Sequence, residues 1–420
     1  MKKKLAILGG GLAGLSAAFH LRRAGKEFLL FEKEEKTGGL SSSFCVNKFS
    51  FDYTGHFLHF KTKAGKALAE RFLKNNLQAH KKRSSVYISG EYIPYPFQKN
   101  FSKLKNKKII AECAAGLAAL QNTKKTKSYK TFKEWILGTT GEGIARHFMF
   151  PYNEKLYKTG LNKLLPGGPA TYIPDIRERK ENAGYNSKFF YPKTGGIGEL
   201  PKALTEKVFD RILLCARVTG IKGGTVSFND KRSVSGFDTV ISTMPLPELI
   251  PLLKGAPQNV LKAAKQLKYV SVFALNLGIA RPALNKNNWI YFADPKLSFY
   301  RVGFYSTVSK KLCPPWTSSL YAEVSLKQGE KFNAKALTFR IKKDLLKTGL
   351  LTKRDSIIAE QPLFMKYGYV VFDLNYNKNM RVINNYLKKR KIISIGRYGS
   401  WNYSAMEDAL LDGRAAAGAV

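Results

Sequence analysis

The glycines near the start of the chain have the spacing that binds a dinucleotide. Gly9, Gly11 and Gly14 fit the pattern GxGxxG. In this pattern the first glycine permits a tight turn, the second lets the backbone approach a pyrophosphate, and the third lets a helix pack on a strand. Glu32 stands where a carboxylate can accept hydrogen bonds from ribose hydroxyls. We therefore expect a dinucleotide site in the first forty residues.

The elements that would position this site are short apolar runs at distant places in the chain. Residues 4–8 predict a buried parallel strand, residues 15–24 a helix and residues 28–31 a second strand, which together form a βαβ unit. Two further strand-like runs, at residues 238–243 and 391–395, look like parts of the same sheet. The nucleotide-binding domain is therefore predicted to be discontinuous, with other domains inserted between its parts.

The segments between these strands differ in character. Residues 100–150 are polar and rich in lysine, with Ala and Leu among them, and are predicted to be helical. Residues 265–330 alternate apolar and polar side chains, most clearly at residues 269–277 and 318–324, and predict an antiparallel sheet. Residues 120–130 predict an exposed loop.

Composition excludes several classes of protein. The apolar share is 44% and the charged share 24%, which is ordinary for a soluble globular enzyme, and 420 residues suffice for two or three packed domains. No apolar run approaches the roughly 20 residues of a membrane-spanning helix. The four cysteines and five histidines lack the spacing of metal ligands, so we expect neither a disulfide framework nor a metal site.

The net charge of +41 has three interpretations. It can reflect a generally lysine-rich composition, with lysines spread over every solvated face. It can also indicate peripheral association with an anionic membrane, and a nucleic-acid partner is the third reading. No folded nucleic-acid motif surrounds the lysine runs, so no nucleic acid is expected. Because glycines interrupt the apolar run that follows the N-terminal lysines, we interpret that run as a mature cytoplasmic N-terminus and not a signal peptide.

A second glycine pair distinguishes FAD from NAD. Gly38 and Gly39 follow Glu32 in the segment Thr-Gly-Gly-Leu-Ser-Ser. This segment resembles the extended FAD fingerprint of the amine oxidase and UDP-galactopyranose mutase group, where the glycine pair lies near the flavin. The resemblance implies that FAD contacts Gly9, Gly11, Leu12, Ala13, Gly14, Glu32, Lys33, Gly38, Gly39, Leu40, Ser41, Gly55, His56, Val218, Gly396, Arg397, Tyr403 and Met406.

The predicted fold class is α/β with three parts. A Rossmann-type FAD-binding domain, which is discontinuous, comprises residues 1–80, 190–262 and 385–420. A mainly helical insert covers residues 98–188. An antiparallel β-sheet substrate domain comprises residues 81–97 and 263–384.

Further motifs, in collinear order over almost the whole chain, resemble the UDP-galactopyranose mutases within the amine oxidase and protoporphyrinogen oxidase superfamily. They lie at residues 51–57, 93–98, 151–157, 185–186, 191–198, 289–291, 299–301 and 396–403. The resemblance implies that His56 lies beside the flavin ring and that Gly55 lets its loop flex. It assigns catalytic roles to His56, Arg301 and Arg397. It implies substrate contacts for Tyr95, Gln98, Asn153, Tyr157, Asn186, Tyr291, Arg301, Tyr369 and Tyr403.

One position departs from the mutase pattern. Mutases carry a second diphosphate-binding arginine downstream of the motif at residues 151–157, and the alignment places Tyr172 there, with Arg177 and Arg179 nearby. Loss of that arginine would remove a charge-assisted contact of about 1.5–3 kcal/mol. Either a sugar nucleotide still binds, or the substrate has changed.

The resemblance implies a reaction that interconverts the pyranose and furanose forms of a UDP-sugar, as used in cell-surface polysaccharide synthesis. In such enzymes N5 of the reduced flavin attacks the anomeric carbon, so the flavin must first be reduced, commonly by NAD(P)H. The main alternative is an FAD-dependent oxidoreductase of amine oxidase or protoporphyrinogen oxidase type that removes hydride from a small molecule. A third reading is a noncatalytic flavin-binding scaffold on a membrane surface. Each is compatible with a cytoplasmic location, peripheral at the inner membrane face in the third case.

Each implied site residue also has a structural interpretation. His56 can be a buried histidine bonded to backbone, and the tyrosines can be ordinary core or surface aromatics. Arg301 lies in a strand-like segment and can pair with a surface acid, while Trp401 and Tyr403 can pack the last helix. The two interpretations differ in whether these side chains face a common cavity.

Overall fold

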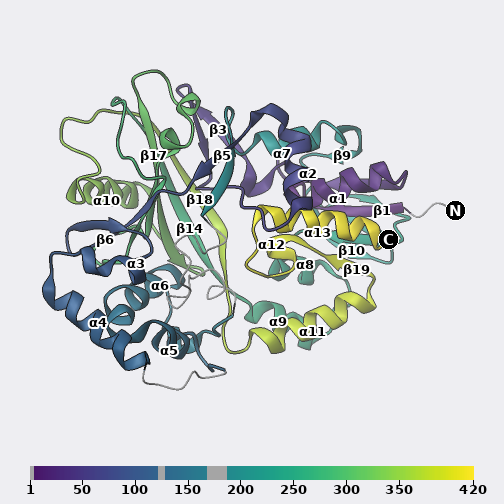
Figure 1. Ribbon diagram of the computed structural model, residues 1–420. Helices are drawn as coiled ribbons and strands as arrows, with labels where there is room; N and C mark the ends of the chain where they lie inside the picture. The colour runs from purple at the N-terminus through teal and green to yellow at the C-terminus, as the bar shows by residue number, and fades with distance from the viewer. Residues whose placement is uncertain (1–3, 122–127, 168–186) are drawn as a thin grey trace.

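The computed structural model describes residues 4–121, 128–167 and 187–420. Its first layer is a parallel sheet of five strands in the order β19-β13-β1-β2-β9, and Figure 1 labels β1, β9 and β19. These strands span Lys4–Leu8 (β1), Glu27–Phe31 (β2), Ile212–Leu213 (β9), Thr239–Ser242 (β13) and Ile392–Ser394 (β19). The prediction that three distant segments share one sheet is confirmed, since β1 pairs with β13 and β13 pairs with β19.

Both faces of this sheet are covered, because alternate side chains of β1 enter two different cores. Leu5 and Ile7 pack on the side of α1 and α13, whereas Ala6 and Leu8 pack on the opposite side. The first side is built by α1 (Leu12–Arg23), α2 (Lys63–Leu73), α7 (Glu199–Thr205) and α13 (Met406–Gly418). The second side is built by β10 (Val218–Lys222), β11 (Thr225–Phe228), β12 (Arg232–Val234), α8 (Leu246–Leu252), α9 (Gln258–Gln266) and α11 (Tyr376–Lys389).

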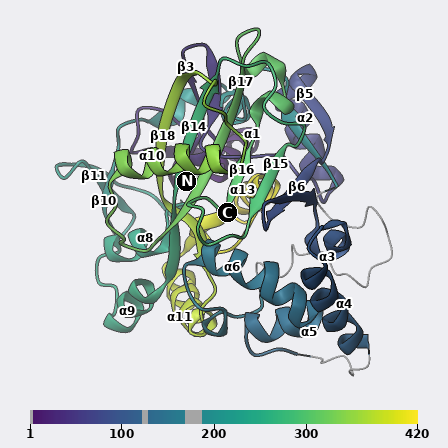
Figure 2. The same ribbon diagram turned by 90° about the vertical axis from the view of Figure 1, so that its left-hand side faces the viewer.

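The second layer is a sheet of seven strands in the order β18-β14-β17-β16-β15-β6-β7. Helix α10 (Ala334–Lys347) covers one face of it, as Figure 2 shows. The strands span Ser84–Ile88 (β6), Glu91–Pro94 (β7), Lys268–Ile279 (β14), Trp289–Phe292 (β15), Arg301–Gly303 (β16), Ser318–Lys327 (β17) and Ile357–Val371 (β18). The expected antiparallel sheet is therefore present, except that β6 and β15 run parallel.

Helices fill the third part, below the seven-stranded sheet in Figure 1. They are α3 (Phe97–Asn100), α4 (Lys107–Gln121), α5 (Phe132–Ile144) and α6 (Phe150–Tyr157), with a π-helical turn at Ala145–Met149. Helices α4 and α5 pack closely because glycines face the neighbouring backbone. A Cβ on Gly143 would lie 2.1 Å from the Glu112 carbonyl oxygen. The predicted helical character of residues 100–150 is confirmed, while part of the loop predicted at residues 120–130 lies outside the described residues.

Small elements join these layers. They are the hairpin β3 (Ser43–Val46) and β4 (Phe49–Asp52), the pair β5 (Leu77–Lys81) and β8 (Lys188–Pro192), and the short helix α12 (Gly396–Gly399). The predicted helix at residues 15–24 begins three residues earlier, at Leu12, because the glycine turn itself forms the helix start. The three-part domain division stays a prediction. Among the described residues, no helix is long and apolar enough to cross a membrane.

Candidate active site

A single cavity of about 2120 Å³ joins the five-stranded sheet to the seven-stranded sheet. Its wall runs from the glycine turn at Gly9 to the aromatic side chains around Tyr95 and Tyr291. Pockets for one small molecule usually measure about 300–1,000 Å³. The cavity therefore has room for a cofactor and a second ligand together.

The glycine turn occupies one end of the cavity, between β1 and α1. Gly9 has a φ of +99°, and its amide donates to the Phe31 carbonyl at 2.8 Å. A Cβ on Gly14 would lie 2.0 Å from the Gly9 carbonyl oxygen, so only glycine lets α1 approach the turn. Around Gly11, by contrast, no atom lies within 4 Å of the Cβ position. This open space lets a ligand approach the start of α1, whose amides and dipole favour a negative group.

Glu32 closes the turn from the end of β2. Its Oε2 accepts the Gly10 amide at 2.6 Å, and its Oε1 accepts the Glu34 amide at 2.9 Å. The side chain is buried but lies on the cavity wall. An ionised carboxylate has about four acceptor positions, so capacity remains for ribose hydroxyls.

The structure brings nearly all the expected cofactor residues to this wall. The cavity is lined by Gly9, Gly11, Leu12, Ala13, Glu32, Lys33, Gly38, Gly39, Leu40, Ser41, Gly55, His56, Val218, Gly396, Arg397, Tyr403 and Met406. Gly14 does not line it and instead sits behind the turn, where it sets the helix packing.

His56 lines the cavity and lies in the loop after β4. Its amide donates to the Thr54 carbonyl at 2.8 Å, and its Nδ1 lies 3.4 Å from the Thr54 hydroxyl. Burial, followed by the positive charges of Arg397 and Arg301, lowers the pKa of His56 to about 3. A Cβ on the preceding Gly55 would lie 1.9 Å from the Tyr321 hydroxyl. Close packing therefore requires a glycine here, and the loop flexibility that the resemblance implied stays a prediction.

Arg301 projects from β16 and forms a fork with Glu323 on β17. Its Nε donates to Oε2 at 2.6 Å and its Nη2 to Oε1 at 2.7 Å. Although burial disfavours the charge, the Glu323 carboxylate holds the pKa of Arg301 well above its usual range. The acid that pairs with Arg301 is fully buried, and not the surface acid that the sequence had suggested. Nη1 takes no part in this pair.

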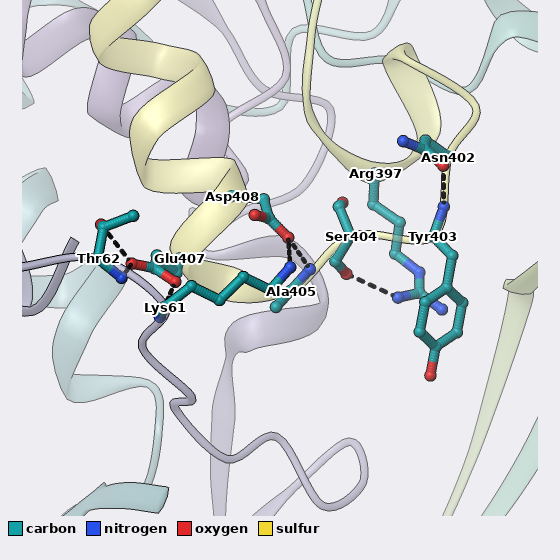
Figure 3. Close-up of polar contacts among 9 residues, drawn as sticks. All are labelled: Lys61, Thr62, Arg397, Asn402, Tyr403, Ser404, Ala405, Glu407 and Asp408. Carbon is teal, nitrogen blue, oxygen red and sulfur yellow. Dashed lines mark hydrogen bonds and ion pairs between the residues drawn. The ribbon is translucent and has the colours of Figure 1, made fainter. Parts of the chain in front are cut away.

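A second cation, Arg397, lies in α12, and its side chain runs beside the Tyr403 ring (Figure 3). Its Nη1 donates to the Ser404 carbonyl at 2.8 Å and its Nη2 to the Gly368 carbonyl at 3.2 Å. The centre of the guanidinium lies 4.6 Å from the Tyr403 ring centroid and 5.4 Å from that of Tyr369. These two rings stack on each other at 6.0 Å with 13° between their planes. Arg397 thus joins the cofactor end to the aromatic end.

Helix α13 is fixed to the cavity wall at its start, as Figure 3 also shows. The buried carboxylate of Glu407 accepts the Lys61 amide at 2.6 Å and both the amide and the hydroxyl of Thr62, at 2.9 and 2.6 Å. Asp408 accepts the Ala405 amide at 2.7 Å. Carboxylates in the first turn stabilise a helix because they interact favourably with the positive end of its dipole. These contacts fix the start of α13, so that Met406 lines the cavity.

Aromatic side chains surround the other end of the cavity. The Tyr95 and Tyr291 rings lie 4.8 Å apart, and the Tyr152 ring meets Tyr291 edge-on at 5.6 Å. Tyr300 donates a hydrogen bond to the Tyr369 hydroxyl at 3.4 Å, so Tyr369 keeps its own proton to donate. Rings at these distances form a surface on which a flat base or a sugar can stack.

The expected substrate residues divide into three groups by position. Tyr95, Asn153, Tyr157, Tyr291, Arg301, Tyr369 and Tyr403 line the cavity. Gln98 does not: its Nε2 lies 3.7 Å from the Met149 sulfur, and its Oε1 is buried without a hydrogen bond. Asn186, like Tyr172, Arg177 and Arg179, lies outside the described residues. Trp401 is fully buried in the core against Tyr367 and does not line the cavity.

Sequence reasoning missed several lining residues, chiefly Tyr152, Tyr300 and Glu323. One signal for Glu323 was present. It is the single acid in the buried strand Ser318–Lys327, and a carboxylate is almost never buried without a partner. Its partner Arg301 stands directly opposite in the β16–β17 register.

Residues 12–315 match the model of a family described as flavin containing amine oxidoreductase. Two curated relatives have partial matches. A carotenoid 3,4-desaturase of Haloarcula japonica is 24% identical over 230 residues, 48% of this chain and 46% of that protein. A probable flavin-containing monoamine oxidase A of Dictyostelium discoideum is 30% identical over 99 residues, 23% of this chain and 21% of that protein. The chain therefore spans less than half the length of either relative.

Solved structures match over nearly the whole chain. A reduced UDP-galactopyranose mutase superposes with a TM-score of 0.92 and 26% identity, covering 99% of this chain and 95% of that one. A putative protoporphyrinogen oxidase from Exiguobacterium sp. 255-15 superposes with a TM-score of 0.79 and 17% identity, covering 100% and 98%. The second likeness shows the fold alone.

Proposed function

The chain belongs to the flavin-containing amine oxidoreductase family, and we propose that within it the chain is a mutase that interconverts the pyranose and furanose forms of a UDP-sugar. One observation supports this most. Two arginines, Arg301 and Arg397, and the stacked tyrosines Tyr369 and Tyr403 face the same cavity as the glycine turn. A diphosphate is the ligand chemistry that such cations and hydroxyls bind.

The described residues fit FAD. The open space beside Gly11 admits a diphosphate to the start of α1, and Glu32 has acceptor capacity for ribose hydroxyls. The pair Gly38 and Gly39 lies opposite Gly11, with a Cβ on Gly39 only 3.3 Å from the Gly11 Cα. When bound and reduced, FAD supplies a nucleophilic nitrogen, and we propose that NAD(P)H or a similar donor provides the electrons.

The chain's own residues would hold the substrate and its leaving group. Arg301 through Nη1 and Arg397 would bind the diphosphate, and Tyr369 would donate a hydrogen bond to it. Keeping the departing UDP in place lets it recombine after the sugar ring changes size. Asn153 and Tyr157 would bind the uridine beside the aromatic surface. His56 would stay neutral beside the flavin, because its pKa of about 3 lies well below neutral pH.

An FAD-dependent oxidoreductase is the alternative, and one observation favours it. Glu323 offsets the charge of Arg301, which lowers the attraction of this end of the cavity for a dianion. A neutral substrate that gives up a hydride would fit such a site. The mutase proposal and this alternative differ in whether UDP binds.

A direct test measures the mutase reaction. Dithionite-reduced protein is mixed with UDP-galactofuranose, and the formation of UDP-galactopyranose is followed by chromatography. We expect conversion by the reduced protein and none by the oxidised protein, which is the matched control. No conversion, together with no binding of UDP at millimolar concentration, would contradict the mutase proposal. Oxygen-dependent oxidation of an amine or a similar substrate would then support the alternative.

Peripheral association with an anionic membrane is proposed on two observations. The net charge is +41, and Trp316 is 84% exposed in the loop before β17, five residues after Lys311 in the sequence. Tryptophan beside lysines suits the boundary between lipid headgroups and water. Sedimentation with anionic and with neutral vesicles tests this, and we expect Trp316→Ser to weaken only the anionic case. Equal binding to both vesicles would contradict it. The cytoplasmic location stays a prediction.

A further inference from the structure

Lys82 lies beside the aromatic end of the cavity, between β5 and β6. Its ammonium sits 4.1 Å from the Tyr95 ring centroid and 5.3 Å from that of Trp289, and both rings line the cavity. The backbone at this point is well fixed. The Lys82 amide donates to the Ser187 carbonyl at 3.1 Å, and the next amide donates to the Asn288 side chain at 2.8 Å.

Lys82 differs from Lys155, which is also half-buried, in the atoms that its ammonium contacts. The Lys155 ammonium donates to the carbonyl oxygens of Asp294 and Phe292, at 2.7 and 3.4 Å. Among the residues that the structure describes, no carboxylate lies within 4.0 Å of the Lys82 ammonium, which lies over the Tyr95 and Trp289 rings. Partial burial of a charge without a carboxylate partner is unfavourable, so an anion beside Lys82 would be stabilising.

The other cations of this end have partners within the protein, although Nη1 of Arg301 takes no part in its pair. Arg301 shares its charge with Glu323 through two hydrogen bonds, and Arg397 donates to two carbonyl oxygens. Lys82 therefore presents the least compensated positive charge near the aromatic surface. Burial, followed by the charge of Arg301, lowers the pKa of Lys82 to about 7. An anion placed beside it would favour the protonated form.

We propose that the Lys82 ammonium binds an anionic group of the substrate and acts as a specificity residue of this site. The group is a phosphate of the nucleotide diphosphate or a carboxylate on the sugar. This inference rests on the proposed function, in which the substrate is a UDP-sugar.

The other groups that face Lys82 do not change charge near neutral pH, so a pH dependence of ligand binding in this range would come from Lys82. Arg301 comes from β16, Tyr95 follows β7, Trp289 begins β15, and His59 precedes α2. Burial lowers the pKa of His59 to about 4, and burial raises the pKa of Tyr95 well above its usual range. Among these groups, Lys82 is the one that changes charge between pH 6 and 9.

The test is calorimetric binding to the oxidised holoenzyme at pH 6, 7.5 and 9. UDP-galacturonate is the main probe, because it carries both candidate groups and neither its diphosphate diester nor its carboxylate changes protonation in this range. We expect the affinity of the unmodified protein to fall about tenfold from pH 6 to 9 as the lysine loses its proton. Lys82→Arg should keep the affinity at pH 9, since a guanidinium stays charged. Lys82→Met should bind about tenfold more weakly at pH 6 and show no pH dependence.

Two further ligands identify the anionic group. If UDP, UDP-galactose and UDP-galacturonate all bind Lys82→Met more weakly, the lysine contacts the diphosphate. If UDP-galacturonate alone is weakened, it contacts a sugar carboxylate. Lys155→Met is the matched control, and it should lose thermal stability but keep the pH profile. If Lys82→Met fails to fold, the ligand affinities of Lys82→Arg and the unmodified protein at pH 9 still test the proposal. Equal affinities at pH 9 would contradict it.

Two outcomes overturn the inference in distinguishable ways. If all three ligands bind Lys82→Met as tightly as they bind the unmodified protein, with the same pH profile, the role of Lys82 alone is wrong. If the unmodified holoenzyme binds none of the three, the proposed function is wrong, and the inference falls with it.

Discussion

The two ends of the cavity are built on different principles. At the cofactor end the ligand-facing groups are backbone atoms, held by Gly9, Gly11 and Gly14 in one turn, with Glu32 fixed by two amides. At the aromatic end they are side chains from many elements, with Arg301 held by Glu323. The first end depends on the absence of side chains, and the second depends on pairs that compensate each other. The two ends should therefore respond differently to substitution.

The largest effect is expected at the aromatic end, from Arg301→Met. The variant leaves Glu323 buried without its partner, which costs about 3–5 kcal/mol of unfolding free energy. Urea denaturation measures this loss. The double variant Arg301→Met with Glu323→Gln should regain most of the stability but not the binding of UDP. A single variant as stable as the unmodified protein would show that the pair is not a compensated unit.

At the cofactor end, two glycines should separate packing from ligand binding. Gly14→Ala places a methyl group against the Gly9 carbonyl and should cost about 3 kcal/mol of apoprotein stability. Gly11→Ala meets no protein atom, so apoprotein stability should stay unchanged while FAD binds more weakly. Thermal denaturation and flavin titration measure the two quantities. Equal destabilisation of the apoprotein by both substitutions would contradict the separate roles of Gly14 in packing and Gly11 in FAD binding.

Because of His56, the folded protein should become less stable as the pH falls below neutrality. Its pKa is about 3 in the folded apoprotein and about 6.5 when unfolded, so the unfolded chain binds one more proton between these values. The stability due to neutral His56 is complete above pH 6.5 and falls as the pH drops, by about 1.4 kcal/mol per unit. Comparing urea denaturation of the unmodified protein and His56→Gln from pH 7 to 5 isolates this slope. Parallel pH profiles would show that the ring is accessible to protons.

The smallest effect is expected from Tyr369→Phe. Tyr300 donates to Tyr369, so the substitution removes both that bond and the proton that Tyr369 can offer to a ligand. A neutral hydrogen bond contributes about 0.5–1.5 kcal/mol, which corresponds to a loss of UDP affinity of about tenfold or less. Calorimetry measures it, with Tyr398→Phe as a control because that hydroxyl bonds the Gly368 carbonyl. A larger loss of UDP affinity in Tyr398→Phe would mean that the position of the Gly368 backbone matters more than a contact between Tyr369 and the ligand.

The same contrast explains what could be predicted from the sequence. The glycine turn and Glu32 lie within one short βαβ segment, where spacing alone determines geometry, and β1, β2, β13 and β19 were expected close to their observed bounds. The start of α1 at Leu12 was missed, because glycines usually indicate a turn, whereas here the helix begins directly after Gly11.

The aromatic end was only partly predictable. The resemblance to mutases pointed to Arg301 and Tyr369, but nothing local says that Glu323 faces Arg301. That contact depends on the antiparallel register of β16 and β17. Lys82 contacts Tyr95 and Trp289 because β6 pairs with β15, and this pairing is parallel where antiparallel pairing was expected. Long-range register is set by the whole sheet, so short motifs do not carry it.

The packing of α13 on α1 has a consequence for how the protein is made. The Ser16 hydroxyl donates to the Leu410 carbonyl at 2.6 Å, across 394 residues of chain. Gly413 fits against the Ala13 carbonyl, where a Cβ would lie 2.5 Å away. A ribosome therefore releases the glycine turn long before the helix that completes its wall. We therefore expect a chain that ends before residue 396 to bind FAD more weakly than the full chain, because Arg397 and Met406 would be missing from the cavity wall.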